Sequence, residues 1–344
     1  MQMIVNRKNQ HLDLAADDRS QSQTSSDYDR VNFVHNALPE LSLDTINSRC
    51  EMWGAEFSIP CMIGAMSGGT GRGDVMNEAL VQAAEKVKIP FALGSQRASI
   101  ESDTSQNRLR QLGPNTFIIG NLGGAQIIGQ KGLDLARRAV DDVEANALMI
   151  HLNPLQEAMQ PEGNTDWRGV SDSLESLVEQ LDIPIIIKEV GAGLSVSVIK
   201  RLYNLGIRSV ETAGIGGTNW TRIEALRHQY EDNPLNCYLE WGVRTVDTLI
   251  ELRQCRHELP TLNVVASGGI RHGLDCARAL WLGADMCAMA QPFLIAALDK
   301  EMDDAIDAVA TLVSDTKKQL QLAMFLTGCA DLETFREQAE VVIK

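Results

Sequence analysis

The residues best suited to bind a phosphate group lie in two turns late in the chain, the first of which is rich in glycine. ASGGIRHG, at 266–273, places Gly268 and Gly269 between an apolar run and a helical pattern, and the second turn, Ala288 to Pro292, has the same surroundings. Tandem glycines let backbone N–H groups approach a phosphate, and the N-terminus of the following helix favours the anion. The alternative is that the glycines serve only a tight turn.

A lysine, Lys188, ends the apolar run in IIIKEVG at 185–191. A buried lysine rarely lacks a partner, and three chemistries suit it. Its charge can stabilise the N1/O2 edge of a reduced flavin, or its amine can form a Schiff base with a carbonyl substrate. The third is an internal ion pair, for which Glu211 is a better partner than Glu189, because strand alternation turns Glu189 to the opposite face.

The segment HLNPLQEAMQPEG, at 151–163, gathers polar side chains after another apolar run. His151, Asn153 and Gln156 are its candidates for ligand contact. Glu157 lies beside amides and a histidine, and one carboxylate combined with phosphate oxygens and water is how Mg2+ is normally bound. The alternative is that Glu157 is an ordinary solvated carboxylate.

Further hydrogen-bond donors follow the other apolar runs. They are Ser95 and Arg97 in GSQR, Asn121 in GN and Thr218 in GIGGTNW. Short hydroxyl or amide groups and a forked guanidinium suit phosphate oxygens and flavin edges. Asn121 is equally suited to capping the next helix.

Eight short apolar runs alternate with helical patterns, at 61–66, 90–94, 117–121, 148–152, 183–190, 209–214, 262–267 and 284–290. This alternation predicts an α/β fold of the (β/α)8, or TIM barrel, type, in which strand ends carry the catalytic residues. We expect an N-terminal extension over 1–60, the barrel over 61–297, and a helical segment over 298–344 packed on it. The polar composition of 17–29 predicts a mobile or ligand-ordered segment.

The composition restricts the possible partners and compartment. The chain has 344 residues and a formal net charge of −15, from 31 basic and 46 acidic side chains. This excess disfavours nucleic acid and anionic membranes as partners, because both require a basic face. Seven cysteines without a C-x-x-C pair are typical of reduced thiols. With no signal-peptide pattern and no apolar run of transmembrane length, we expect a soluble, cytoplasmic protein.

A basic cluster near the N-terminus stands out from this acidic composition. Arg7, Lys8 and His11 lie within five positions of one another. Taken alone, such a cluster is typical of an exposed basic tail.

Motifs spread along most of the chain, from Arg7 to about Leu294, resemble those of the type 2 isopentenyl-diphosphate isomerases, which depend on FMN. They are RKNQHL at 7–12, AMSGG at 65–69, GSQR at 94–97, HLNPLQE and QPEG within 151–163, KEVG at 188–191, GGTNW at 216–220, WGVRT at 241–245 and ASGGIR at 266–271. HLNPLQE and the RK-x-x-H cluster are the most discriminating, because related FMN barrels share the ASGGIR-type turn but not those two motifs.

The resemblance implies interconversion of isopentenyl and dimethylallyl diphosphates by a homo-oligomer, a tetramer or octamer, that uses Mg2+ and FMN reduced by NADPH. It implies Mg2+ binding by Glu157 and substrate contacts from Arg7, Lys8, His11, Ser95, Arg97, His151, Asn153 and Gln156. It implies FMN contacts from Ala65, Met66, Ser67, Ser95, Asn121, Lys188, Thr218, Gly268, Gly269, Ile270, Arg271, Ala290 and Gln291. Four positions depart from the family pattern, where Thr, Asp, Phe and Pro are usual: Ser67, Asn164, Trp167 and Arg244.

The implied reaction is a 1,3-allylic proton shift without net redox change. Protonation of the alkene builds carbocation-like character, which an electron-rich reduced flavin can stabilise, and flavin N5 can also act as acid and base. Gln156 and Glu224, the latter in NWTRIE, are candidates to assist at the other proton position. A helical glutamate is otherwise usually solvent-facing.

Two other functions compete with this one. FMN-dependent oxidation of α-hydroxyacids uses the same barrel and requires a histidine and arginines, and Arg271 and His272 lie side by side after the seventh run. The second competitor is a catalytically silent flavin-binding scaffold. HLNPLQE and the RK-x-x-H cluster favour the isomerase.

Overall fold

A closed barrel of eight parallel strands forms the centre of the protein, and it confirms the predicted fold class. The computed structural model describes residues 2–66, 71–229 and 232–344. The barrel strands are β4 (Cys61–Ile63), β5 (Phe91–Ala92), β6 (Ile118–Gly123), β7 (Ala147–His151), β8 (Ile185–Lys188), β9 (Ser209–Glu211), β10 (Asn263–Ala266) and β11 (Met286–Met289). Each strand overlaps one of the eight apolar runs, and pairing of β9 with β10 and of β11 with β4 closes the ring.

Alternation along the strands separates two hydrophobic layers. Met62 points into the barrel, where it joins a cluster that includes Met149 and Ile186, while Ile63 packs outward against the helices. A two-residue period therefore also directs the last residues of β8 and β9, Lys188 and Glu211, inward.

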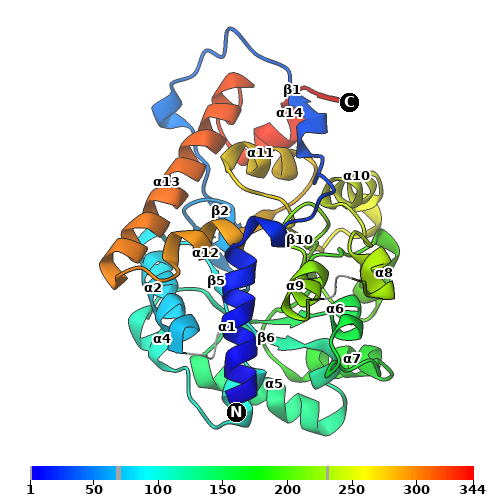
Figure 1. Cartoon of the computed structure of the whole chain (residues 1–344). Helices are drawn as coiled ribbons and strands as arrows, with labels where there is room; N and C mark the ends of the chain where they lie inside the picture. Colours follow the sequence, from blue (N-terminus) through cyan, green and yellow to red (C-terminus); the bar gives the residue numbers. More distant parts are fainter. Residues whose placement is uncertain (1, 67–70, 230–231) are drawn as a thin grey trace.

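Helices surround the barrel (Figure 1). They are α2 (Gly71–Val87), α3 (Arg97–Glu101), α4 (Arg108–Leu112), α5 (Gly129–Val143), α6 (Pro154–Met159), α7 (Val170–Gln180), α8 (Val196–Asn204), α9 (Trp220–Arg227), α10 (Thr245–Cys255), α11 (Gly273–Trp281) and α12 (Gln291–Ala297). Their apolar faces cover the outer side of the strands, so the polar strand ends are left at the mouth of the barrel.

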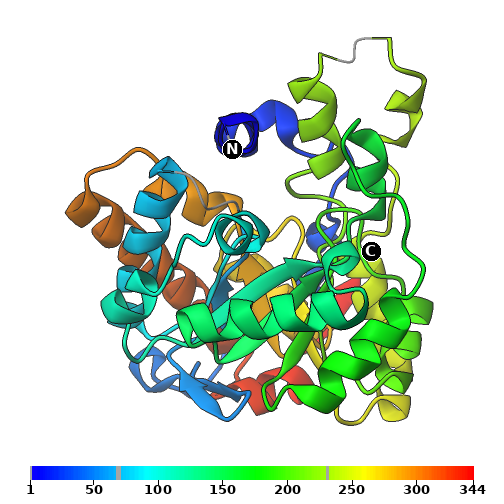
Figure 2. The same cartoon turned by 90° about the horizontal axis from the view of Figure 1, so that it is seen from below.

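A hairpin closes the opposite end of the barrel. It consists of β2 (Cys50–Met52) and β3 (Ala55–Phe57), and Figure 2 shows it at the far end from the N-terminal helix. The Trp53 ring stacks on Phe117 with centroids 5.4 Å apart, and its Nε1 donates to Ser209 Oγ at 2.9 Å. The barrel is therefore a plugged core that opens only at its C-terminal mouth.

The N-terminal helix α1 (Gln2–Ala16) lies across that mouth and contacts α9 (Figures 1 and 2). The next residues, for which the composition predicted mobility, have defined partners in the structure. Ser22 N donates to Gly217 O at 2.8 Å, and Ser22 Oγ donates to Glu240 Oε2 at 2.5 Å. This polar segment bonds to the loop between β9 and α9 and to the loop before α10, which a composition argument does not detect.

The C-terminal part of the chain returns to the N-terminal part. Helix α13 (Met302–Leu326) packs on α2, α11 and α12, and α14 (Leu332–Gln338) follows it. The last strand, β12 (Val341–Ile343), pairs antiparallel with β1 (Val31–Phe33). Within the described ranges, none of the helices combines the length and apolar character that crossing a bilayer requires.

Candidate active site

The mouth of the barrel contains two adjoining cavities. The glycine-walled compartment, about 90 Å3, is bounded by the turns after β9, β10 and β11. The cation-lined compartment, about 660 Å3, is bounded by α1, α3, α6 and α9. Ala65, Lys188, Val190 and Trp220 border both, so one extended ligand can occupy the two together.

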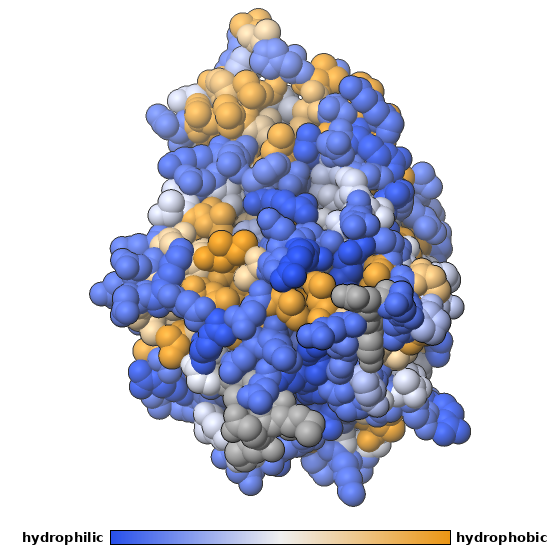
Figure 3. Space-filling view, viewed as in Figure 1, coloured by the Kyte–Doolittle hydropathy of each residue, from blue (hydrophilic) through white to orange (hydrophobic). Residues whose placement is uncertain are grey.

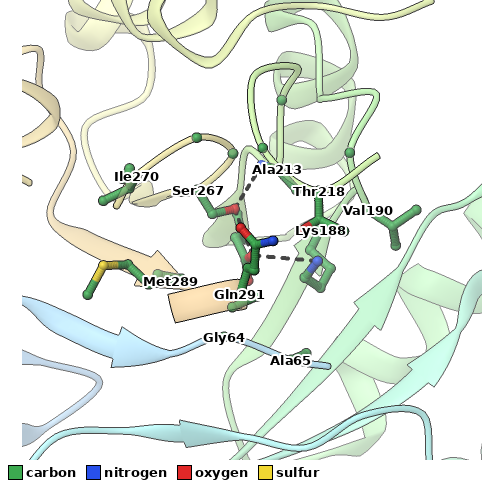
Figure 4. Close-up of a pocket in the computed structure, with 18 of the residues that line it drawn as sticks. Gly64, Ala65, Lys188, Val190, Ala213, Thr218, Ser267, Ile270, Met289 and Gln291 are labelled. Atoms are coloured by element: carbon green, nitrogen blue, oxygen red, sulfur yellow. Dashed lines mark hydrogen bonds and ion pairs between the residues drawn. The ribbon is translucent and has the colours of Figure 1, made fainter. Parts of the chain in front are cut away.

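Backbone geometry shapes the glycine-walled compartment, which Figure 4 shows from within. Gly268 and Gly269 have φ of +97° and +81°, a region that side-chain-bearing residues rarely adopt. A Cβ on Gly269 would lie 2.7 Å from Gly216 O and would also overlap Ser26. The two glycines are therefore required by close approach of three chain segments, and the turn they form exposes N–H groups to an anion.

Lys188 forms an ion pair with Glu211 between the two compartments, so the predicted internal pair is present. Its Nζ lies 3.5 Å from Glu211 Oε1 and donates to Glu189 O at 2.5 Å. Glu189 faces the other side, as alternation predicted, where its carboxylate accepts N–H groups of the loop over 190–193. Lys188 also lines both compartments, so this pair does not remove it from the site.

A neutral histidine faces the cation-lined compartment from the end of β7. Burial, together with the nearby charge of Lys188, lowers the pKa of His151 to about 3. Asn121 Nδ2 donates to Leu93 O at 2.9 Å, so its Oδ1, 2.8 Å from His151 Nδ1, is the acceptor. His151 therefore carries its proton on Nδ1 and offers an unprotonated Nε2. Asn121 orients this ring. It does not cap the following helix, which is the other role that its sequence position suggested.

Three side chains of the loop and helix after β7 fix one another. Asn153 Nδ2 donates to Gln156 Oε1 at 3.0 Å and to Glu157 Oε1 at 3.1 Å. Glu157 Oε2 accepts from Asn164 N at 2.6 Å. Both Gln156 and Glu157 line the cation-lined compartment, so an amide and a carboxylate are held side by side at its wall.

A chain of ion pairs docks α1 on α9. His11 Nε2 lies 3.0 Å from Glu224 Oε1, and Arg227 Nε donates to Glu224 Oε2 at 2.7 Å. Glu162 then accepts from Arg227 at 3.0 Å and from Arg7 at 3.5 Å. The helical spacings, four residues from Arg7 to His11 and three from Glu224 to Arg227, put each pair on one face.

The enclosed carboxylate of Glu224 is ionised. Burial alone would raise the pKa of Glu224, but the hydrogen bond and charge of His11 and the charge of Arg227 outweigh burial and lower the pKa to about 2. Gln156 Nε2 and Gln160 Nε2 also donate to it, at 3.1 and 2.7 Å. Glu224 is fully buried behind the cavity wall, so it reaches the cavity through Gln156 and His11.

Two more cations border the cation-lined compartment. Burial lowers the pKa of Lys8 to about 8, although the charge of Asp74 acts in the opposite direction, and its Nζ lies 3.5 Å from Ser95 O. Arg97 Nε pairs with Glu101 at 2.8 Å, and both side chains are about half exposed. Arg97 is therefore available to a ligand that displaces Glu101.

The structure brings together nearly all of the predicted site residues. The cation-lined compartment is bordered by Arg7, Lys8, His11, Ala65, Met66, Ser95, Arg97, Asn121, His151, Asn153, Gln156, Glu157 and Lys188. The glycine-walled compartment is bordered by Ala65, Lys188, Thr218, Gly268, Gly269, Ile270, Arg271, Ala290 and Gln291. Glu224 lies behind the wall, and Ser67 lies outside the described residues.

Sequence analysis missed three residues of this mouth. Trp220 borders both compartments and packs edge-on against His11, with ring centroids 5.1 Å apart. Arg227 and Glu162 complete the ion-pair chain. The motif GGTNW contains Trp220, and the three-residue spacing from Glu224 is the signal that could have identified Arg227.

The histidine that the hydroxyacid-oxidising alternative requires lies elsewhere. His272 caps α11, accepting from Asp275 N at 3.3 Å, and its side chain is 49% exposed. It is not among the residues that border the two compartments. Arg271 borders the glycine-walled compartment and donates to Gly216 O at 3.0 Å. This geometry does not provide the adjacent histidine and arginine of that chemistry.

Relatives of known name match nearly the whole chain. It is 39% identical over 342 residues to the isopentenyl-diphosphate delta-isomerase of Stutzerimonas stutzeri. This match covers 98% of this chain and 96% of that protein. It is 41% identical to the enzyme of the same name from Xanthobacter autotrophicus (96% and 95%) and 40% identical to that from Deinococcus radiodurans (97% of each). The chain belongs to the isopentenyl-diphosphate delta-isomerase family. A sequence model described as FMN-dependent dehydrogenase matches residues 155–341, which identifies the flavin-dependent, type 2 branch of the isomerase family.

Solved structures with the same architecture are flavoenzymes. A mandelate oxidase variant with a monooxide FMN adduct superposes with a TM-score of 0.65 at 16% identity, covering 97% of this chain and 92% of that one. A flavocytochrome b2 variant with pyruvate bound gives a TM-score of 0.69 at 17% identity, covering 97% and 82%. At this identity the likeness concerns the fold, so this isomerase-family chain shares its barrel with those oxidases.

Three of the four departures from the isomerase pattern lie among the described residues and have visible partners. Asn164 contributes its backbone N–H to Glu157, a contact that does not depend on its side chain. Arg244 lies 3.5 Å from Asp27, which fastens the loop before α10 to the N-terminal segment. Trp167 packs against the barrel core. These contacts leave the walls of both compartments intact.

Proposed function

We propose that this protein interconverts isopentenyl diphosphate and dimethylallyl diphosphate by a 1,3-allylic proton shift that requires reduced FMN and Mg2+. The observation that carries the proposal is the position of α1, which brings Arg7, Lys8 and His11 to the rim of a cavity that continues into a glycine-walled phosphate cradle. A basic N-terminal helix facing a flavin-type compartment suits a diphosphate substrate.

FMN fits the glycine-walled compartment and its junction with the larger one. Gly268, Gly269, Thr218 and Gln291 would hold the phosphate, because the first two permit close backbone approach. Lys188 would lie at the flavin ring, with Ala65, Met66, Ser95, Asn121, Ile270, Arg271 and Ala290 around the cofactor. The reduced cofactor supplies an electron-rich ring that stabilises positive charge and an exchangeable proton.

The diphosphate would bind in the cation-lined compartment. Arg7, Lys8 and Arg97 supply positive charge at its rim, with His11, Ser95, His151 and Asn153 as further contacts. Among the described residues no group of three or more His, Cys, Asp or Glu side chains is arranged to hold a metal. Glu157 would therefore bind Mg2+ jointly with diphosphate oxygens, as a single carboxylate often does. These remote contacts orient the alkene over the ring.

Gln156 is the amide that we propose assists the proton transfer. Its Nε2 donates to ionised Glu224 and its Oε1 accepts from Asn153, so both ends of the amide are fixed. Sequence analysis gave Glu224 a direct role at the second proton position. Because its carboxylate is enclosed, we now propose that Glu224 acts through Gln156 and His11, whose positions it fixes.

The proposal is tested by anaerobic incubation of the protein with isopentenyl diphosphate, FMN, NADPH and Mg2+, followed by assay for dimethylallyl diphosphate. We expect product only when FMN is reduced, with NADPH or dithionite as reductant. Full activity with oxidised FMN would contradict the role of the reduced ring. Bound FMN with no product, but with oxidation of an α-hydroxyacid, would instead favour the oxidase alternative.

We also propose a cytoplasmic homo-oligomer, a tetramer or octamer. All seven cysteines are free, which suits a reducing compartment. Apolar side chains gather at the end of the molecule that carries β1 and the C-terminal part of α13 (Figure 3), including exposed Leu38, Val342 and Ile343. Light scattering of the purified protein tests the assembly, and a monomer at all concentrations would refute it.

A further inference from the structure

A buried ion pair lies where the two compartments meet. The side chains of Lys188 and Glu211 are 7% and 4% exposed, with 3.5 Å between Nζ and Oε1. Ser267 Oγ donates to the same carboxylate oxygen at 2.7 Å and accepts from Ala213 N at 3.0 Å. Figure 4 shows Lys188, Ser267 and Ala213 around one hollow. The carboxylate is therefore held rigidly at the wall of a ligand site.

The second oxygen of this carboxylate has no hydrogen-bond donor among the described residues. Glu211 Oε2 is shielded from solvent, and no hydrogen bond reaches it from the described residues. Glu211 also borders the glycine-walled compartment. An ionised oxygen buried without a donor is strongly unfavourable, so a donor on the ligand is the natural partner for Oε2.

The position of Glu211 identifies the part of FMN that it meets. The same compartment is bordered by the glycine turns, which would hold the phosphate. Lys188, at the junction of the two compartments, would meet the flavin ring. The ribityl chain joins phosphate to ring, so it must pass between these groups. Its hydroxyls are the donors that a carboxylate at this point can accept.

The surrounding charges make Glu211 electrostatically important. Lys188 is its partner, His151 on β7 is neutral, and Glu189 points away, toward the loop N–H groups. With Glu211 ionised, the Lys188–Glu211 pair has no net charge. Without that carboxylate, the positive charge of Lys188 would act unopposed on the flavin ring, at low effective dielectric.

We propose that Glu211 is a flavin-binding residue that accepts a hydrogen bond from a ribityl hydroxyl and, by balancing Lys188, keeps the reduction potential of the bound flavin low. A low potential means a reduced ring that is rich in electrons, which is what stabilisation of a carbocation-like alkene requires. The inference rests on the FMN site of the proposed function, but not on isomerase activity.

The test is the midpoint potential of bound FMN in the native protein, Glu211→Asp and Glu211→Gln, measured by anaerobic spectroelectrochemistry without substrate. Loss of the negative charge favours added electrons, so Glu211→Gln should shift the reduction equilibrium at least about tenfold toward reduced flavin, which is about 30 mV for a two-electron couple. Glu211→Asp keeps the charge but withdraws it by one methylene, so its potential should lie between the other two.

Each outcome decides the inference. An unchanged or lower potential in Glu211→Gln, with FMN bound, overturns it. If Glu211→Gln fails to retain FMN, Glu211→Asp carries the test alone, and an unchanged potential in that variant overturns the inference. A merely structural role would lower FMN occupancy or the melting temperature without moving the potential. Failure of the proposed function would appear separately, as native protein that binds no FMN or forms no product.

Discussion

The two compartments of the mouth are built in different ways. The glycine-walled compartment is formed by backbone at the ends of β9, β10 and β11, with glycines at positive φ. The cation-lined compartment is formed by long side chains on α1, α6 and α9, held by ion pairs between segments far apart in sequence. The first is part of the barrel scaffold, whereas the second exists only when α1 is docked.

The two compartments should therefore be sensitive to different kinds of substitution. A backbone cradle is rigid, so it is damaged by added atoms or by a change in φ. A side-chain network adapts to size, but it contains buried charges that are costly when one partner is removed. Substitutions in the buried network and in the backbone cradle should therefore have larger effects than substitutions at the exposed rim.

Glu224→Gln should give the largest loss of activity. The change preserves the shape of the side chain but removes its negative charge. His11 and Arg227 pair with that charge, and Gln156 and Gln160 donate hydrogen bonds to it. Loss of orientation at the reacting atoms should lower kcat/KM on the order of 10^2-fold. Glu162→Gln, at the 44% exposed end of the same network, is the matched control and should lose about tenfold less. Equal losses in both variants would contradict the central position of Glu224.

Gly269→Ala should weaken FMN binding about tenfold or more. The left-handed backbone costs a residue with a side chain roughly 1–2 kcal/mol, and the new methyl would meet Gly216 O and Ser26. Fluorescence titration of flavin measures the affinity. Gly283→Ala is the control, because Gly283 has φ of +105° but lies in the turn between α11 and β11. It should lower the melting temperature and leave FMN affinity unchanged.

Lys8 should make substrate affinity depend on pH. Its pKa is lowered to about 8, so it is charged below that pH and loses its charge as the pH rises through it. The KM for isopentenyl diphosphate should therefore rise about fivefold between pH 7 and pH 9. In Lys8→Arg this rise should disappear, because a guanidinium stays protonated. A similar rise in both proteins would assign the effect to another group.

Glu101→Gln should have the smallest effect. Its ion pair with Arg97 is about half exposed, and exposed pairs contribute little free energy. Freeing Arg97 for the diphosphate should lower KM by no more than about twofold, with kcat unchanged. A tenfold change would show that Glu101 has a larger part in substrate entry than its exposure indicates.

The sequence was sufficient to predict the barrel and its cradle. Strand periodicity is a local property of the sequence. The eight apolar runs therefore identified all eight strands, and alternation along the run that contains Lys188 predicted that this lysine points inward. The cradle was equally predictable, because glycines such as Gly268 and Gly269 at a strand-to-helix turn have few other uses.

The side-chain network was less predictable, because its contacts join distant segments. Nothing in the sequence near Arg227 or Glu162 indicates that α1 will dock there. Glu224 lies on a helix, where a glutamate is usually exposed to solvent, so its burial was not predicted. The same applies to residues 17–29, whose polar side chains suggested mobility until their partners, Gly217 and Glu240, were known. Pairings of this kind require the three-dimensional structure.

The pairing of β1 with β12 has a consequence for how the protein is made. Val31 pairs with Ile343, and Lys344 N donates to Arg30 O at 2.9 Å, so the segment that follows α1 is fastened by residues that are translated after all eight barrel strands. The barrel strands leave the ribosome well before that point. A newly made chain can therefore complete the glycine-walled compartment before β12 fastens the N-terminal segment that borders the cation-lined compartment.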